Sequence, residues 1–189
     1  MKKYLTILAF CLAFVSSAFA VSLNENSIKI YFEGFKTPAM LGTKGGFTKA
    51  TFKLNKNTQS LSTQLINANI ILSPNDIDMG DNQVITDNVV NTFFKTLNNK
   101  NDIKVTIINV LEGENRGVIT AKITINKQNA LLPLVYEIGR NNDFEATGRL
   151  DLLAFSNATK ALTALSEVAS GHLGISWNIV DIKIEAKLQ

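Results

Sequence analysis

The chain has 189 residues, of which 46% are hydrophobic, and its 19 basic and 16 acidic side chains give a formal net charge of +3. This length suits one domain with a sizeable core. The near balance of charge argues against nucleic acid as a partner and against strong attraction to anionic membrane surfaces, because both need a clustered basic face.

The first 20 residues have the features of a secretory signal peptide. Two lysines precede an apolar run that ends at Val15, and small residues follow as far as Ala20. A basic start, a short apolar run and an A-x-A ending are typical of cleaved signals, and the run is too short for a lasting membrane anchor. We therefore expect cleavage after residue 20, a single domain over 21–189 and a secreted, periplasmic protein. Its net charge is +1, because Lys2 and Lys3 leave with the signal.

Few residue types suited to catalysis or metal binding remain in the mature chain. The one cysteine of the full chain, Cys11, belongs to the signal, so the mature chain has none. The one histidine, His172, is interpreted as a solvated turn residue. The stretch 76–81 has Gly80 one place too early for a calcium loop, so we interpret it as a turn with Asp81 capping the next helix. We predict no catalytic residue, no metal and no cofactor.

Eight segments of the mature chain alternate apolar and polar residues, which is typical of strands with one apolar face. Asn- and Gly-rich turns separate many of them, and such short connections favour antiparallel hairpins. In the last segment the apolar parity changes between Trp177 and Val180, which predicts a β-bulge near Ile179. The segments cover 28–33, 49–54, 65–72, 103–111, 119–125, 132–138, 144–150 and 175–187.

Two other segments have helical spacing. In the first, Ile85, Val89 and Phe93 recur every four residues after the Asp81 cap, and the second runs over 158–168 after a Ser156 cap. The glycine-rich stretch 42–46 lacks the ending of a phosphate-binding loop and is interpreted as flexible backbone.

These elements predict an all-β fold with two short helices, arranged as an eight-stranded antiparallel barrel or a sandwich. An eight-stranded barrel either fills its own interior or holds one small ligand. Small residues such as Ala121 and Ala146 alternate with bulky ones, and the residues alone favour a filled core. An outer-membrane barrel is rejected, because each mid-strand lysine facing lipid, such as Lys122, would cost ~2–4 kcal/mol.

Several segments, taken in their order, form a recognisable pattern: Gly42–Phe47, Asn75–Gly80, Asn91–Lys95, Ile123–Asn126, Leu132–Leu134, Gly148–Leu152 and Trp177–Ile184. In this order they resemble the YceI-like family, and the resemblance covers Ser27 to Leu188. It implies a lipocalin-like, eight-stranded antiparallel barrel whose apolar tunnel binds long amphiphiles such as polyprenyl chains, isoprenoid quinones or fatty-acid derivatives. The resemblance therefore favours a hollow interior.

The same resemblance places Phe93 and Phe94, at the end of the first helix, at the tunnel. There they would form a lid across the mouth of the barrel. The other predicted ligand-binding residues follow from the alternation of the strands: Phe32, Phe52, Ile70, Ile119, Ile123, Leu134, Tyr136, Phe144 and Trp177.

We therefore expect a non-catalytic periplasmic carrier or sequestering protein for a long-chain amphiphilic lipid, without permanent membrane insertion and without a nucleic-acid partner. Two alternatives stay open. One is a lipid-modifying hydrolase that uses His172 or a carboxylate at the mouth such as Asp87. The other is a solid-core structural or interaction protein, and a homodimer is open in either case.

Overall fold

The computed structural model describes residues 21–56 and 58–189. The predicted signal peptide lies outside the described residues, so its cleavage stays a prediction. Within the described ranges, no helix combines the length and the apolar character that a membrane crossing needs.

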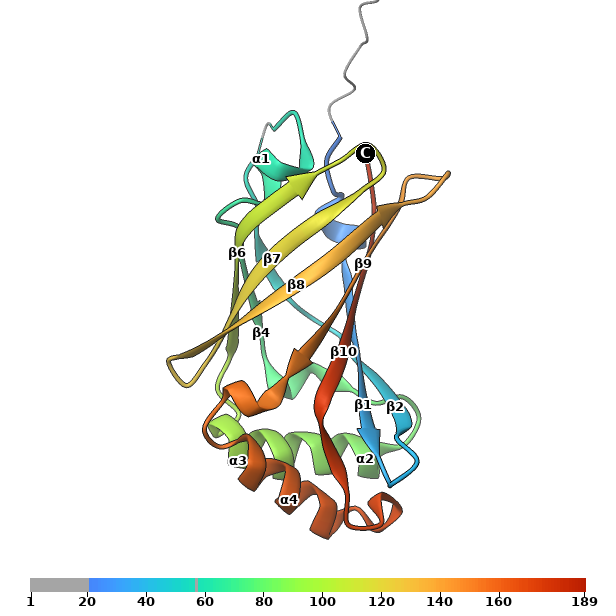
Figure 1. Cartoon of the computed structure of the whole chain (residues 1–189), viewed down its shortest axis with the longest axis vertical. Coiled ribbons are helices and arrows are strands. Elements are labelled where there is room, and N and C mark those ends of the chain that lie inside the picture. Colours follow the sequence, from blue (N-terminus) through green and yellow to red (C-terminus); the bar gives the residue numbers. More distant parts are fainter. Residues whose placement is uncertain (1–20, 57) are drawn as a thin grey trace, which may run out of the picture.

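One antiparallel sheet of ten strands curls around an apolar interior (Figure 1). The spatial order is β3-β4-β6-β7-β8-β9-β10-β1-β2-β5, so β3 and β5 are the two outer strands of the sheet. The predicted antiparallel, barrel-like all-β class is confirmed. The strands are β1 (Lys29–Lys36), β2 (Leu41–Phe47), β3 (Thr51–Lys53), β4 (Asn69–Leu72), β5 (Ile77–Asp78), β6 (Ile103–Glu112), β7 (Arg116–Ile125), β8 (Gln128–Ile138), β9 (Asp143–Asp151) and β10 (Ser176–Lys187).

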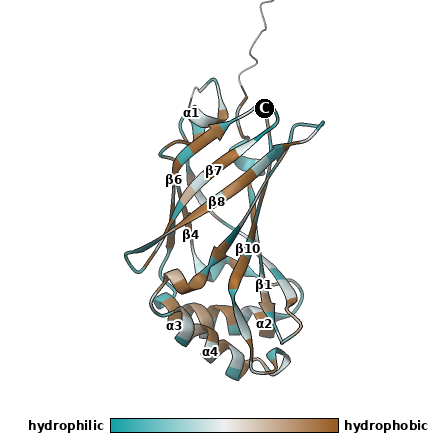
Figure 2. Cartoon of the chain, in the orientation of Figure 1, coloured by the Kyte–Doolittle hydropathy of each residue, from teal (hydrophilic) through white to brown (hydrophobic). Residues whose placement is uncertain are grey.

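The long strands show how the two-residue period directs side chains. On β8, Leu132, Leu134 and Tyr136 are buried, whereas the residues between them are exposed. Figure 2 shows hydrophobic residues recurring along β6, β7 and β8. On the outer face Lys183 pairs with Glu145 and Glu185, each at 2.9 Å, which is consistent with a face in water. Exposed pairs of this kind contribute little stability, so the inner face holds the fold together.

The structure has two strands more than the eight predicted, β2 and the short β5. The interpretation of 42–46 as flexible backbone is wrong, because these residues are the body of β2. Gly45 pairs with Phe32 and Gly46 pairs with Tyr31 on β1. A Cβ atom on Gly45 would lie 2.8 Å from Cζ of Phe32, so this glycine leaves room for the ring inside the sheet.

The bulge predicted near Ile179 is confirmed. Gly34 of β1 pairs with Val180, but Lys36, two residues on, pairs with Ser176, four residues back along β10. The two additional residues of β10 bring both Trp177 and Val180 to the inner side, as the change of parity requires.

Helices lie across both ends of the curled sheet (Figure 1). One end carries α1 (Leu61–Leu65), and the other carries α2 (Gln83–Asn88), the π-helix η3 (Val89–Phe94), α3 (Lys95–Asn98) and α4 (Ala158–Val168). The strand predicted over 65–72 is wrong at its start, because α1 ends at Leu65 and the strand begins only at Asn69. Four 3-10 turns complete the structure: η1 (Glu25–Ser27), η2 (Pro74–Asp76), η4 (Leu152–Ala154) and η5 (Ser170–His172).

Both predicted helix caps are wrong, although both helices exist. The side chain of Asn82, and not Asp81, accepts a hydrogen bond from the N–H of Val84 at 3.1 Å. Before α4, the N–H and hydroxyl of Ser156 donate to Oε1 of Gln128 at 2.8 and 3.1 Å, so a tertiary contact takes this side chain away from the helix.

The close packing of β1 on β2 leads to a stability prediction. We expect Gly45→Ala to lower the free energy of unfolding by about 1–3 kcal/mol, because the new methyl group overlaps the Phe32 ring and overpacking of a core costs that much. Urea denaturation measures the change. Gly34→Ala is the matched control, because nothing lies within 4 Å of a Cβ at that position. Equal losses in the two variants would contradict this account of β2.

Candidate functional site

The curled sheet encloses an apolar cavity of about 490 Å³. This volume lies within the range of about 300–1,000 Å³ that small-molecule sites occupy. A filled core, which the residues alone favour, is therefore wrong. Buried inward positions such as Ala121 and Ala146 carry small side chains. These side chains leave part of the space inside the curled sheet unfilled.

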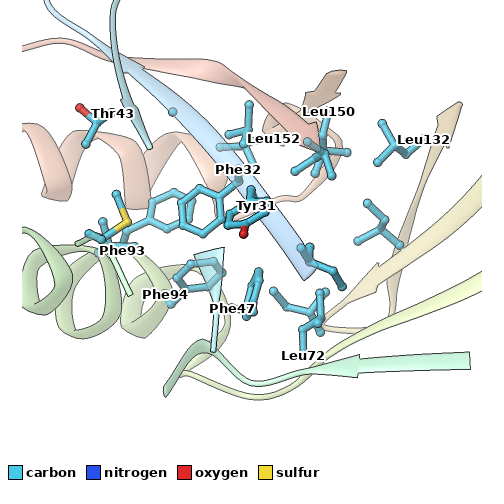
Figure 3. A pocket seen from close by; sticks show the side chains of 18 of the residues that line it. Tyr31, Phe32, Thr43, Phe47, Leu72, Phe93, Phe94, Leu132, Leu150 and Leu152 are labelled. Atoms are coloured by element: carbon cyan, nitrogen blue, oxygen red, sulfur yellow. The ribbon is translucent and has the colours of Figure 1, made fainter. Parts of the chain in front are cut away.

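Aromatic side chains dominate the part of the cavity next to the helices. Phe32 and Phe47 lie with ring centroids 5.9 Å apart, and Phe93 and Phe94 meet edge to face at 5.0 Å. Figure 3 shows these rings grouped near η3, with Leu132 and Leu150 farther along the cavity. The wall thus changes from aromatic at the helical end to aliphatic inside.

All but one of the predicted ligand-binding residues lie in the cavity wall. Whether they contact a ligand stays a prediction. Those in the wall are Phe32, Phe52, Ile70, Phe93, Phe94, Ile119, Ile123, Leu134, Phe144 and Trp177.

Tyr136 has the predicted inward direction but does not reach the cavity. Its side chain is fully buried and stacks on Phe144 at a centroid distance of 5.3 Å. The ring also covers Gly117, where a Cβ would lie 2.6 Å from Cε1 of Tyr136. Alternation correctly predicts which face of the strand a side chain lies on. It does not predict whether that side chain lines the cavity or lies in the packed part of the interior.

The end of the sheet near α1 is closed by side chains from distant parts of the chain. Leu61 and Leu65 of α1 are buried there, and Gln64 holds Leu23 by two hydrogen bonds, to its N–H at 2.7 Å and to its carbonyl at 3.0 Å. A buried side chain that satisfies both backbone groups fixes the N-terminal segment over this end. We therefore assign the mouth of the cavity to the opposite end, which α2, η3 and α4 cover and where the polar residues of the wall lie.

The lid residues Phe93 and Phe94 both lie in the cavity wall. They are the last two residues of the π-helix η3 (Val89–Phe94). Single π turns of this kind occur frequently at functional sites.

Sequence reasoning missed the polar residues of the wall, which gather at the mouth. Lys36 is the clearest example of a missed residue. It has the same inward parity on β1 as Ile30 and Phe32, and this parity is the signal that could have identified it. The other polar residues there are Thr43, Asn82, Asn88, Ser170, His172 and Ser176.

His172 is not the solvated turn residue that was predicted. It is partly buried and lies in the cavity wall, with Nδ1 at 2.7 Å from Oγ of Ser176. Burial, and next the positive charge of Lys36, lower the pKa of the imidazole below its ordinary value of 6.5. Asp87, the other candidate for hydrolysis, is exposed and accepts a hydrogen bond from Gln83 at 3.0 Å.

Comparison with solved structures shows the fold. No protein-family model and no curated protein matches the chain. BcnA of Burkholderia cenocepacia superposes with a TM-score of 0.63 at 16% identity, covering 89% of this chain and 99% of that one. A polyisoprenoid-binding domain of Saccharophagus degradans gives a TM-score of 0.63 at 13% identity, covering 90% and 98%. The YceI protein of Campylobacter jejuni gives 0.54 at 17% identity, covering 80% and 88%. The chain therefore has the YceI-like fold that the resemblance implies.

The environment of His172 predicts how it titrates. We expect its pKa to lie below 6.5 and to rise only part of the way back in Lys36→Gln, because burial is the larger cause of the shift. NMR titration of the single histidine of the mature chain measures both values. Since the unfolded chain binds the proton more readily, the contribution of His172 to stability should fall as the pH drops below 6.5 and become constant below its folded-state pKa. A pKa at or above 6.5 would contradict this environment.

Proposed function

We propose that this protein binds a long-chain amphiphilic lipid, of the polyprenyl, isoprenoid quinone or fatty-acid type, inside the curled sheet. The observation that carries the proposal is the cavity of about 490 Å³ inside the curled sheet, whose wall is apolar except for a group of polar residues at one end. One structure of the same fold is described as a polyisoprenoid-binding domain. An apolar space with polar residues at one end suits a ligand with a long apolar chain and a compact head group.

Burial of the chain supplies the affinity in this proposal. Apolar surface removed from water contributes about 25 cal/mol per Å², which amounts to ~0.8 kcal/mol for each buried methylene group. Association costs ~4–15 kcal/mol, so a short chain binds weakly and a long one binds tightly. The aromatic lid of Phe93 and Phe94 adds contact area where the chain enters.

The proposed role is non-catalytic carriage or sequestration in the periplasm, after export by the predicted signal. Ser176 and His172 are hydrogen-bonded, but within the described residues no carboxylate holds the imidazole as a catalytic triad requires. Asp87 also lies away from the cavity wall. These placements favour binding without hydrolysis of the ligand.

Native mass spectrometry tests the proposal directly. We expect the mature protein, purified gently from its own periplasm, to carry one long-chain amphiphile that solvent extraction releases for identification. Repeated recovery of empty protein, together with failure to take up any amphiphile added in excess, would refute lipid binding.

A chain-length series tests the source of the affinity. With one head group kept constant, we expect the dissociation constant to fall about fourfold for each added methylene until the cavity is full, and then to level off. Displacement of a fluorescent apolar probe measures it. Affinity that is independent of chain length would show that the interior does not hold the chain.

A further inference from the structure

The polar residues of the cavity wall share one position in the fold. They come from the end of β1, from β2, from α2, and from η5 with the start of β10, all at the end covered by α2 and α4. Figure 3 shows Thr43 at this end of the cavity and Leu132 at the other. An amphiphile that enters chain-first therefore leaves its head group among these residues.

The charge in the cavity wall has one sign. Lys36 lies in the wall, and among the described residues that form the wall there is no Asp or Glu. Lys36 is partly buried, and it makes no ion pair with a carboxylate in residues 21–56 and 58–189. A cation withdrawn from water without a partner is unfavourable, and an anionic ligand removes that penalty.

His172 lies next to this cation. The Nζ atom of Lys36 is 4.0 Å from the position of a Cβ on Gly171, the residue before His172. The carboxylate nearest to this cluster along α4 is Glu167, which is exposed and borders a separate groove with Ser176. Within the cavity the two basic side chains thus face a ligand together.

A chain of hydrogen bonds fixes which nitrogen of His172 remains for a ligand. The Ser166 hydroxyl donates to the carbonyl of Leu162 at 2.9 Å, so it accepts from the Ser176 hydroxyl at 2.8 Å. Because each hydroxyl has one hydrogen, Ser176 must then accept from Nδ1–H of His172 at 2.7 Å. Nε2 is left without a partner among the described residues, and a second proton on the ring would bind there.

We propose that Lys36 and His172 form a head-group site that selects amphiphiles with an anionic head, a carboxylate or a phosphate, over neutral ones. The inference rests on the proposed function. Lys36 provides a positive charge in the wall of the cavity. His172, with Nδ1 held by Ser176, takes up a proton at Nε2 when the anion binds and then donates a hydrogen bond to it.

Ligands of one chain length and different heads test the selectivity. We expect the wild-type protein to bind a fatty acid or an alkyl phosphate about tenfold or more tightly than the matching amide, because a hydrogen bond to a charged group is worth at least that ratio. Comparison of the acid with the phosphate identifies which anion the site prefers. Probe displacement at about pH 7 measures all three.

Variants assign the selectivity to Lys36. We expect Lys36→Gln to lose most of the preference for the acid over the amide, and Lys36→Arg to retain it. Lys44→Gln is the matched control, because Lys44 is exposed on β2 and lies outside the wall. Equal binding of acid and amide by the wild type, or an undiminished preference in Lys36→Gln, would overturn the head-group site. Failure of every ligand to bind the wild type would refute the proposed function itself.

Proton uptake assigns the part of His172. We expect acid binding to be severalfold tighter at about pH 6 than at about pH 8, whereas amide binding changes little. The difference should disappear in His172→Gln, which cannot gain a charge. A pH dependence of acid binding that persists in His172→Gln would overturn the role of this residue.

Discussion

Covering the inner face of a sheet that curls on itself is the constraint on which the rest of this structure depends. Ten antiparallel strands turn one apolar face inward, and that face must be shielded from water. Side chains that fully interdigitate would shield it by filling the interior. Here the inward positions include Gly34, Ala121 and Ala146, and the shielding is achieved at the two ends instead, by α1 on one side and by η3 and α4 on the other. The consequence is an enclosed apolar space.

The two ends are closed in different ways, and this difference gives the cavity a direction. Near α1, Tyr136 and Phe144 stack, and Gln64 holds the backbone of Leu23 by two hydrogen bonds, so this end is closely packed. At the other end the closure consists of aromatic rings on a π-helix and of polar side chains around Lys36. The apolar interior matches the chain of an amphiphile, and Lys36, which has no ion pair among the described residues, matches its head group.

Much of the sheet was predictable because strand alternation is a local property. The parity of β8 and the change of parity in β10 both follow from neighbouring residues, whereas the place of Phe93 and Phe94 at the tunnel came from the family resemblance. Strand β2 could not be predicted in this way, because its glycines show no alternation of apolar and polar residues. They matter through side chains that occupy the space a Cβ on β2 would need, such as Met79 and Phe32 at Gly45 and Tyr31 at Gly46. The caps failed for a similar reason, since Gln128 takes up Ser156 from across the fold.

By itself, the sequence determined which residues face inward on most strands, that the strands are antiparallel and where two helical regions lie, because these features depend on spacing along the chain. Only the tertiary structure decided that the interior is hollow, that Tyr136 lies beyond the cavity and that Lys36 meets His172 at its mouth. These features depend on the curvature of the sheet and on contacts between residues more than a hundred positions apart. Hydrophobic periodicity carries no information about the distance between two inward-facing side chains, and that distance separates a packed core from a binding cavity.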